Sequence, residues 1–92
     1  MKLEQAKEWL RVDGDANDQI IGDLLLGTEQ YIEQATGIRT QDQELNPLAE
    51  TCQKMLLSLW YNPDQDGADK IQRTIDNLLK SLSYKSLTYT KL

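Results

Sequence analysis

The sequence predicts an all-α protein, a compact bundle of about four helices (one short, three longer) with an extended C-terminal tail. Apolar residues recur every three or four positions through most of the chain, which is the spacing of a helix with one buried face. Cap and stop residues stand at the ends of these stretches. Hydrophobic residues make up 39% and charged residues 27% of the 92 residues, a balance typical of one globular domain.

The short first helix is predicted at residues 3–10, where apolar side chains fall on one face and Trp9 lies beside them. On a short helix with little core of its own, Trp9 is a candidate contact with another subunit. The turn at residues 13–15 follows, and Asp15 is expected to cap the next helix.

The second helix is predicted at residues 16–36 and carries the longest apolar stripe. The members of this stripe are Ile20, Ile21, Leu24, Leu25, Thr28, Tyr31, Ile32 and Ala35. Gly22 and Gly27 each cost up to about 1 kcal/mol inside a helix, so we expect another helix to pack closely against both. Gly37 is expected to end the helix in a left-handed cap, with Ile38 folding back as its apolar clip.

The polar residues 39–45 are predicted to form a loop. Asn46-Pro47 then starts a third helix that runs to about residue 61, because a capping side chain precedes a proline at the first helical position. Trp60 lies on the apolar face of this helix, so core packing is its expected role. The fourth helix is predicted at residues 68–82.

The chain is therefore divided into a helical domain at residues 1–82 and a tail at residues 83–92. Apolar and polar residues mix in the tail, which predicts an extended segment. The tail is either a partner-binding arm or a frayed terminus. Its candidate contact residues are Tyr84, Leu87, Tyr89 and Leu92.

The chain contains 15 acidic and 10 basic residues, for a formal net charge of −5. Between residues 13 and 50 the acids far outnumber the single cation, Arg39; they are Asp13, Asp15, Asp18, Asp23, Glu29, Glu33, Asp42, Glu44 and Glu50. Nucleic-acid binding needs clustered Lys and Arg, so this balance argues against it and fits solubility. No apolar run approaches the ~20 residues of a membrane span, and a cytosolic protein is expected.

The sequence lacks the residues of common catalytic and metal sites. It has no histidine, and its single cysteine, Cys52, falls in an apolar helical pattern that predicts a buried structural thiol. The Asp13 turn resembles a calcium loop but has Asp18 where glycine and Leu24 where glutamate are required. We therefore expect no enzyme activity, no metal and no cofactor.

Three stretches carry a resemblance to a known family when they are read together. They are LEQAKEWLRVDGD at residues 3–15, YIEQATG at residues 31–37 and LLSLWYN at residues 56–62. In this order and at these spacings they resemble the head–tail connector (adaptor) proteins of long-tailed bacteriophages and prophages. The resemblance covers residues 3–82 and departs from the family pattern at residues 62–67, where many members carry a basic residue.

The resemblance implies a structural protein of the virion neck, made in the host cytoplasm. Such a protein forms a ring of copies on the portal, extends the DNA channel and presents a surface to the next neck or tail protein. The family is neither enzymatic nor cofactor-dependent, and DNA passes through without specific binding. The acids Glu29, Glu33, Asp42 and Glu44 are candidates to face this channel. Two alternatives remain open: a small helical DNA-packaging or DNA-binding protein, and a regulator that binds one protein partner.

Overall fold

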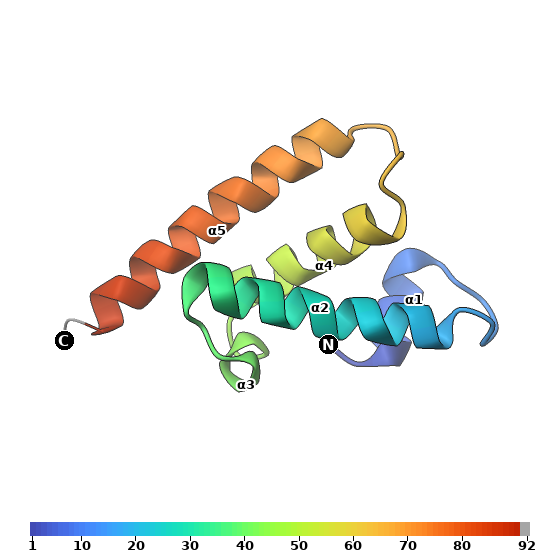
Figure 1. Cartoon of the computed structure of the whole chain (residues 1–92), viewed down its shortest axis with the longest axis horizontal. Helices are drawn as coiled ribbons and strands as arrows, with labels where there is room; N and C mark the ends of the chain where they lie inside the picture. The colour runs from blue at the N-terminus through green and yellow to red at the C-terminus, as the bar shows by residue number, and fades with distance from the viewer. Residues whose placement is uncertain (91–92) are drawn as a thin grey trace.

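The computed structural model describes the backbone of residues 1–90 and the side chains of residues 1–83 (Figure 1). Its elements in chain order are α1 (Leu3–Leu10), α2 (Asp18–Thr36), α3 (Thr40–Gln43), α4 (Pro47–Tyr61) and α5 (Ala68–Thr90). No strand occurs among the described residues, and the all-α prediction is confirmed. The four longer helices correspond to those expected from the apolar periodicity.

The core consists of two clusters of buried side chains that share α4. The larger cluster joins the C-terminal half of α2 to α4 and α5, and its buried members are Ile32, Ala49, Cys52, Leu56, Ile75, Leu79 and Leu82. The smaller cluster joins α1 to the N-terminal half of α2 and to α4, through Ala6, Ile21, Leu25 and Leu57. Because adjacent residues in a helix point about 100° apart, Leu56 and Leu57 can each serve a different cluster.

The connection between α1 and α2 differs from its prediction. Helix α2 begins at Asp18, two residues later than expected, and the predicted cap at Asp15 is wrong. Asn17 occupies the cap position without a side-chain cap bond, and its amide instead donates to the Tyr61 hydroxyl at 3.1 Å. The carboxylate that lies in the first turn is Asp18, which pairs with Lys7 at 2.9 Å. An acid at this end of a helix is favoured by the helix dipole.

The other predicted caps are confirmed. Gly37 ends α2 with a left-handed φ of 82°, and Ile38 packs against the larger core cluster. At the start of α4 the Asn46 side chain accepts hydrogen bonds from the backbone N–H groups of Leu48 and Ala49, at 3.1 and 3.3 Å. These bonds satisfy donors that the first turn of a helix leaves free.

The segment at residues 39–45, expected to be a loop, contains the one-turn helix α3. Its anchor is Gln43, whose side chain is 3% exposed and donates to the carbonyls of Glu29 at 2.9 Å and Ile38 at 3.1 Å. A buried amide in a polar segment gives no periodic signal, so the sequence pattern could not reveal this tertiary contact.

Helix α5 continues to Thr90, whereas the sequence predicted an extended segment from Ser83. No glycine or proline stands between Ala68 and Leu92 to stop the helix. The Ser83 hydroxyl donates to the carbonyl of Ala35 at 2.8 Å, which ties α5 to the C-terminal end of α2. Tyr84, Leu87 and Tyr89 belong to α5, but their side chains lie outside the described residues, as does Leu92 entirely.

The buried face of α2 is narrower than the predicted stripe. Ile21 and Ile32 are fully buried, but Ile20 is 57% exposed and Tyr31 is 41% exposed. At residues 35 and 36 the apolar side chain of Ala35 is exposed, whereas the next residue is buried. Ile21, Leu25 and Ile32 form the buried face of α2, and Ile20 points about 100° away from Ile21, outside this face.

The two glycines of α2 have different surroundings. A Cβ atom at Gly27 would lie 3.3 Å from Cζ3 of Trp60, so the expected close packing is confirmed there. A Cβ atom at Gly22 would meet nothing within 4 Å, so the same expectation is wrong at that position. Only Gly27 is therefore required for the approach of α4.

This contrast predicts the effect of placing alanine at each glycine. Gly22→Ala should raise the free energy of unfolding by roughly 0.5–1 kcal/mol, because alanine loses less backbone entropy in a helix. Gly27→Ala should gain less or lose stability, because its methyl group must displace the Trp60 ring. Urea denaturation of both variants checks this, and an equal gain at the two positions would contradict the close packing at Gly27.

Candidate functional site

Helix α1 is attached to the bundle through Trp9. The indole Nε1 donates to the backbone carbonyl of Lys54 on α4 at 2.9 Å, and the Lys54 ammonium lies 5.7 Å from the ring centroid. The side chain nevertheless remains 46% exposed. Trp9 therefore has a defined role within the chain and also offers half of its surface to a partner.

A shallow hollow of about 490 Å³ borders the exposed side of Trp9. Its lining also includes Arg11, Ser58, Tyr61 and Asn62, so it runs from the end of α1 to the end of α4. A second link holds α1, because Lys7 donates to Asp18 on α2, and this hydrogen bond raises the pKa of Lys7. The surface around Trp9 is thus supported by two neighbouring helices.

The four acids predicted to face a channel lie on α2 and around α3. Gln43 binds the carbonyl of Glu29, which places α3 against α2 at that residue. Asp42 and Glu44 flank Gln43 in the sequence and are exposed, whereas Glu29 and Glu33 are half-buried one turn apart on α2. The structure therefore brings Glu29 beside the segment that carries Asp42 and Glu44.

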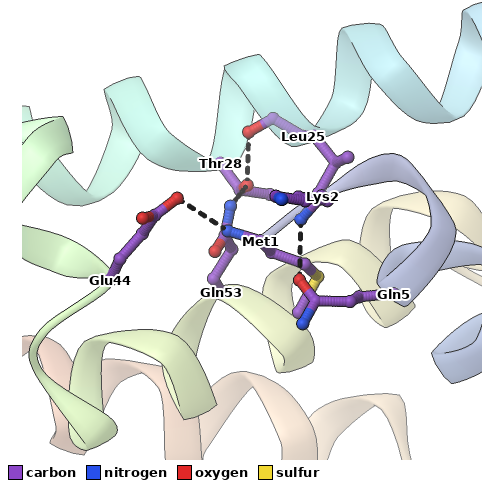
Figure 2. Close-up of polar contacts among 7 residues, drawn as sticks. All are labelled: Met1, Lys2, Gln5, Leu25, Thr28, Glu44 and Gln53. Atoms are coloured by element: carbon purple, nitrogen blue, oxygen red, sulfur yellow. Dashed lines mark hydrogen bonds and ion pairs between the residues drawn. The ribbon is translucent and has the colours of Figure 1, made fainter.

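Most of this charge is not neutralised by cations among the described side chains. Two ion pairs occur among the described side chains and the amino group of Met1: Lys7 with Asp18, and Met1 with Glu44 at 3.6 Å (Figure 2). Neither pair includes Glu29, Glu33 or Asp42. This part of the surface consequently carries a negative potential.

A buried polar contact joins α2 and α4 beneath Met1 (Figure 2). The Gln53 amide donates to the Thr28 hydroxyl at 3.1 Å, and Thr28 donates to the carbonyl of Leu25 at 2.7 Å. Gln53 is 3% exposed and Thr28 is fully buried. Because buried polar groups are costly without partners, these bonds fix the register of α4 on α2. They lie next to Glu29, one of the four acids described above.

Sequence reasoning missed an exposed apolar surface on the other side of α2. Tyr31 packs edge-to-face on Trp60 of α4, with ring centroids 5.6 Å apart and an interplanar angle of 89°. Ile20 and Leu24 lie on the same side of the helix, and Leu24 is half-buried. We call Ile20, Leu24, Tyr31 and Trp60 the aromatic strip. The adjacent apolar pair Ile20–Ile21 is the sequence signal that could have indicated it.

The thiol of Cys52 is fully buried, as predicted, and burial raises its pKa to about 11. It is therefore protonated near neutral pH, the state of an inert structural cysteine. Among the described side chains, no group of three His, Cys, Asp or Glu residues could hold a metal ion. None of the helices, as far as the chain is described, is long and apolar enough to cross a membrane.

The chain matches the model of a known protein family. A family model described as phage gp6-like head–tail connector protein matches residues 1–89. The match spans α1 to α4 and nearly all of α5, and it includes the three stretches that carry the sequence resemblance. Neither the curated proteins nor the solved structures contain a match.

Removing the anchor of α3 tests the structural role of Gln43. Gln43→Ala should lower the free energy of unfolding by roughly 1–3 kcal/mol, because it removes the two hydrogen bonds that the buried amide donates to the carbonyls of Glu29 and Ile38. Gln41→Ala changes an exposed residue of the same helix and should have little effect. Urea denaturation measures both, and equal effects would show that α3 does not depend on the Gln43 contacts.

The buried thiol predicts a loss of stability at alkaline pH. The pKa of the thiol rises from 9.0 to about 11 on folding. Its contribution to the free energy of unfolding is therefore complete below pH 9 and declines as the pH rises towards 11, because only the unfolded state readily loses the proton. Between pH 9 and pH 11 the free energy of unfolding of the wild type should fall by about 2 kcal/mol more than that of Cys52→Ala. Unfolding by urea across this range compares the two proteins, and parallel pH profiles would refute the prediction.

Proposed function

Because the chain belongs to the family of phage gp6-like head–tail connector proteins, we propose that it forms a ring of identical copies docked on a portal. A member of this family is a structural component of the virion and interacts with other head and tail proteins. The ring extends the DNA channel and presents a surface to the next neck or tail-completion protein. The match over residues 1–89 is the observation that carries this proposal.

We further propose that the ring is assembled in the host cytoplasm and then remains in the virion neck. A chain with two small core clusters gains stability by burying surface against neighbours, which favours assembly over an isolated subunit. Neither a cofactor nor a metal has a role in this function.

The acids Glu29, Glu33, Asp42 and Glu44 are proposed to face the channel. Like charges repel, so carboxylates at the lumen would keep DNA phosphates from adhering to the wall. The support is that α3 lies against α2 at Glu29 and that three of these four acids have no cation paired with them among the described residues.

The contacts with other chains are proposed at Trp9 and in the tail, residues 83–92. Trp9 is half-exposed beside a hollow, which is the usual setting of an aromatic residue in an interface. The tail residues Tyr84, Leu87, Tyr89 and Leu92 supply apolar side chains for a partner-binding arm, with the portal or another copy as receiver.

Light scattering of the purified protein, alone and with its portal protein, tests the proposal. A complex of many copies that forms on the portal supports it. A stable 1:1 complex with a single partner and no ring would instead favour a regulator. Salt-sensitive nanomolar binding to DNA in a filter assay would favour a DNA-binding protein.

Charge reversal tests the channel. Replacing Glu29, Glu33, Asp42 and Glu44 by lysine should leave the ring intact and slow DNA passage, because the wall would then attract phosphates. The control replaces Asp13, Asp15, Asp64 and Asp66, which are exposed in turns, by lysine and should behave as wild type. The measurements are ring mass, DNA retained in filled heads and plaque titre. A wild-type titre from the first variant would exclude these acids from the channel wall.

A further inference from the structure

The aromatic strip leaves large apolar side chains in contact with solvent. Ile20 is 57% exposed and Tyr31 is 41% exposed, and the Trp60 ring lies flush against α2 because Gly27 has no side chain there. The strip thus combines aliphatic and aromatic groups on two helices that the core holds in place. An aromatic cluster of this kind is characteristic of the centre of a protein interface.

The chain cannot cover the Ile20 end of this strip with its own C-terminal segment. Ser83 is bonded to Ala35 at the far end of α2, and Ile20 lies about 22 Å away along the helix axis at about 1.5 Å per residue. Beyond Ser83 the last turns of α5 continue past the C-terminal end of α2, away from Ile20 (Figure 1). Any C-terminal segment that covers Ile20 must therefore come from another molecule.

The charges of the two surfaces are complementary. Asp23 borders the strip on α2, and no strip residue is a cation, whereas residues 84–92 contain Lys85 and Lys91 and no acid. Asp23 is exposed one turn after Ile20 and has no paired cation among the described side chains. An acidic helix with exposed apolar groups therefore fits a segment that is both apolar and cationic.

We propose that the aromatic strip of one copy binds residues 84–92 of a second copy. This inference rests on the proposed ring and assigns its subunit contact. The Tyr84 and Leu87 region covers the apolar strip, and the lysines of the segment lie near Asp23 at its edge. The strip and the segment are different surfaces of the same chain, so each copy both gives a segment and receives one. Such a head-to-tail contact produces a ring when the rotation between copies closes.

Full-length variants test the two halves of the contact separately. Ile20→Asp places an acid in the first turn of α2, which the helix tolerates, and should weaken self-association at least about tenfold. The tail variant Y84Q/L87Q keeps good helix formers and should weaken it to a similar degree. Leu45→Asp is the control for the first, because Leu45 is 83% exposed outside the strip. The double variant S86Q/T88Q is the control for the second.

Mixing the two defective variants provides the decisive measurement. Ile20→Asp retains an intact tail and Y84Q/L87Q retains an intact strip, so an equimolar mixture should form a 1:1 dimer that neither variant forms alone. Sedimentation velocity in low and high salt measures the masses, and high salt should weaken every complex. A monomeric mixture, wild-type association of either variant, or a wild type that stays monomeric at millimolar concentration would overturn the proposal.

Failure of this contact is distinguishable from failure of the proposed function. Incorporation into phage heads is scored in parallel, using heads that contain the portal but lack the connector. If the wild type enters these heads while the mixture stays monomeric, the strip contact is wrong and the connector function stands. If the mixture dimerises while the wild type does not enter heads, the contact stands and the portal-docking function is wrong.

Discussion

The packing of α4 is the constraint on which the rest of the structure depends. This helix contributes Cys52 and Leu56 to the larger core cluster and Leu57 to the smaller one, so it connects α5 to α1 through a single element. In a chain of 92 residues there is little further surface to bury. The hydrogen bond between Gln53 and Thr28 then fixes the register of α4 against α2.

Because α4 packs in both core clusters, it determines which face of α2 is buried and which remains exposed. Only one face of α2 meets the core, so Ile20 and Tyr31 remain at the surface although they are apolar. On the other side of α2, the Gln43 anchor holds α3 against Glu29 and gathers acids there. The same helix thus presents an apolar surface and an acidic surface, an arrangement that is compatible with the proposed ring around DNA.

The sequence predicted which residues belong to the candidate site, but it did not predict how they are arranged in space. Trp9 was identifiable as an exposed aromatic on a short helix, yet its bond to Lys54 depends on a contact across 45 positions of the chain. The acids Glu29, Glu33, Asp42 and Glu44 can be read from the sequence. No local sequence pattern, however, shows that Gln43 holds α3 against α2. Ile20 and Tyr31 were mistaken for core, because periodicity marks apolar residues without showing how wide the buried face is, whereas Trp60 packs against the larger core cluster as expected.

The sequence by itself determined the four longer helices, the caps at Gly37 and Asn46, and the family, because these depend on local spacing and on residues such as Gly37, Asn46 and Pro47. It also determined the buried state of Cys52 through its place in an apolar stripe. The tertiary structure alone decided the start of α2, the existence of α3, the different roles of Gly22 and Gly27, and the exposure of Ile20. Each of these follows from which neighbour a residue meets across the bundle, and that is set by packing between segments distant in the chain.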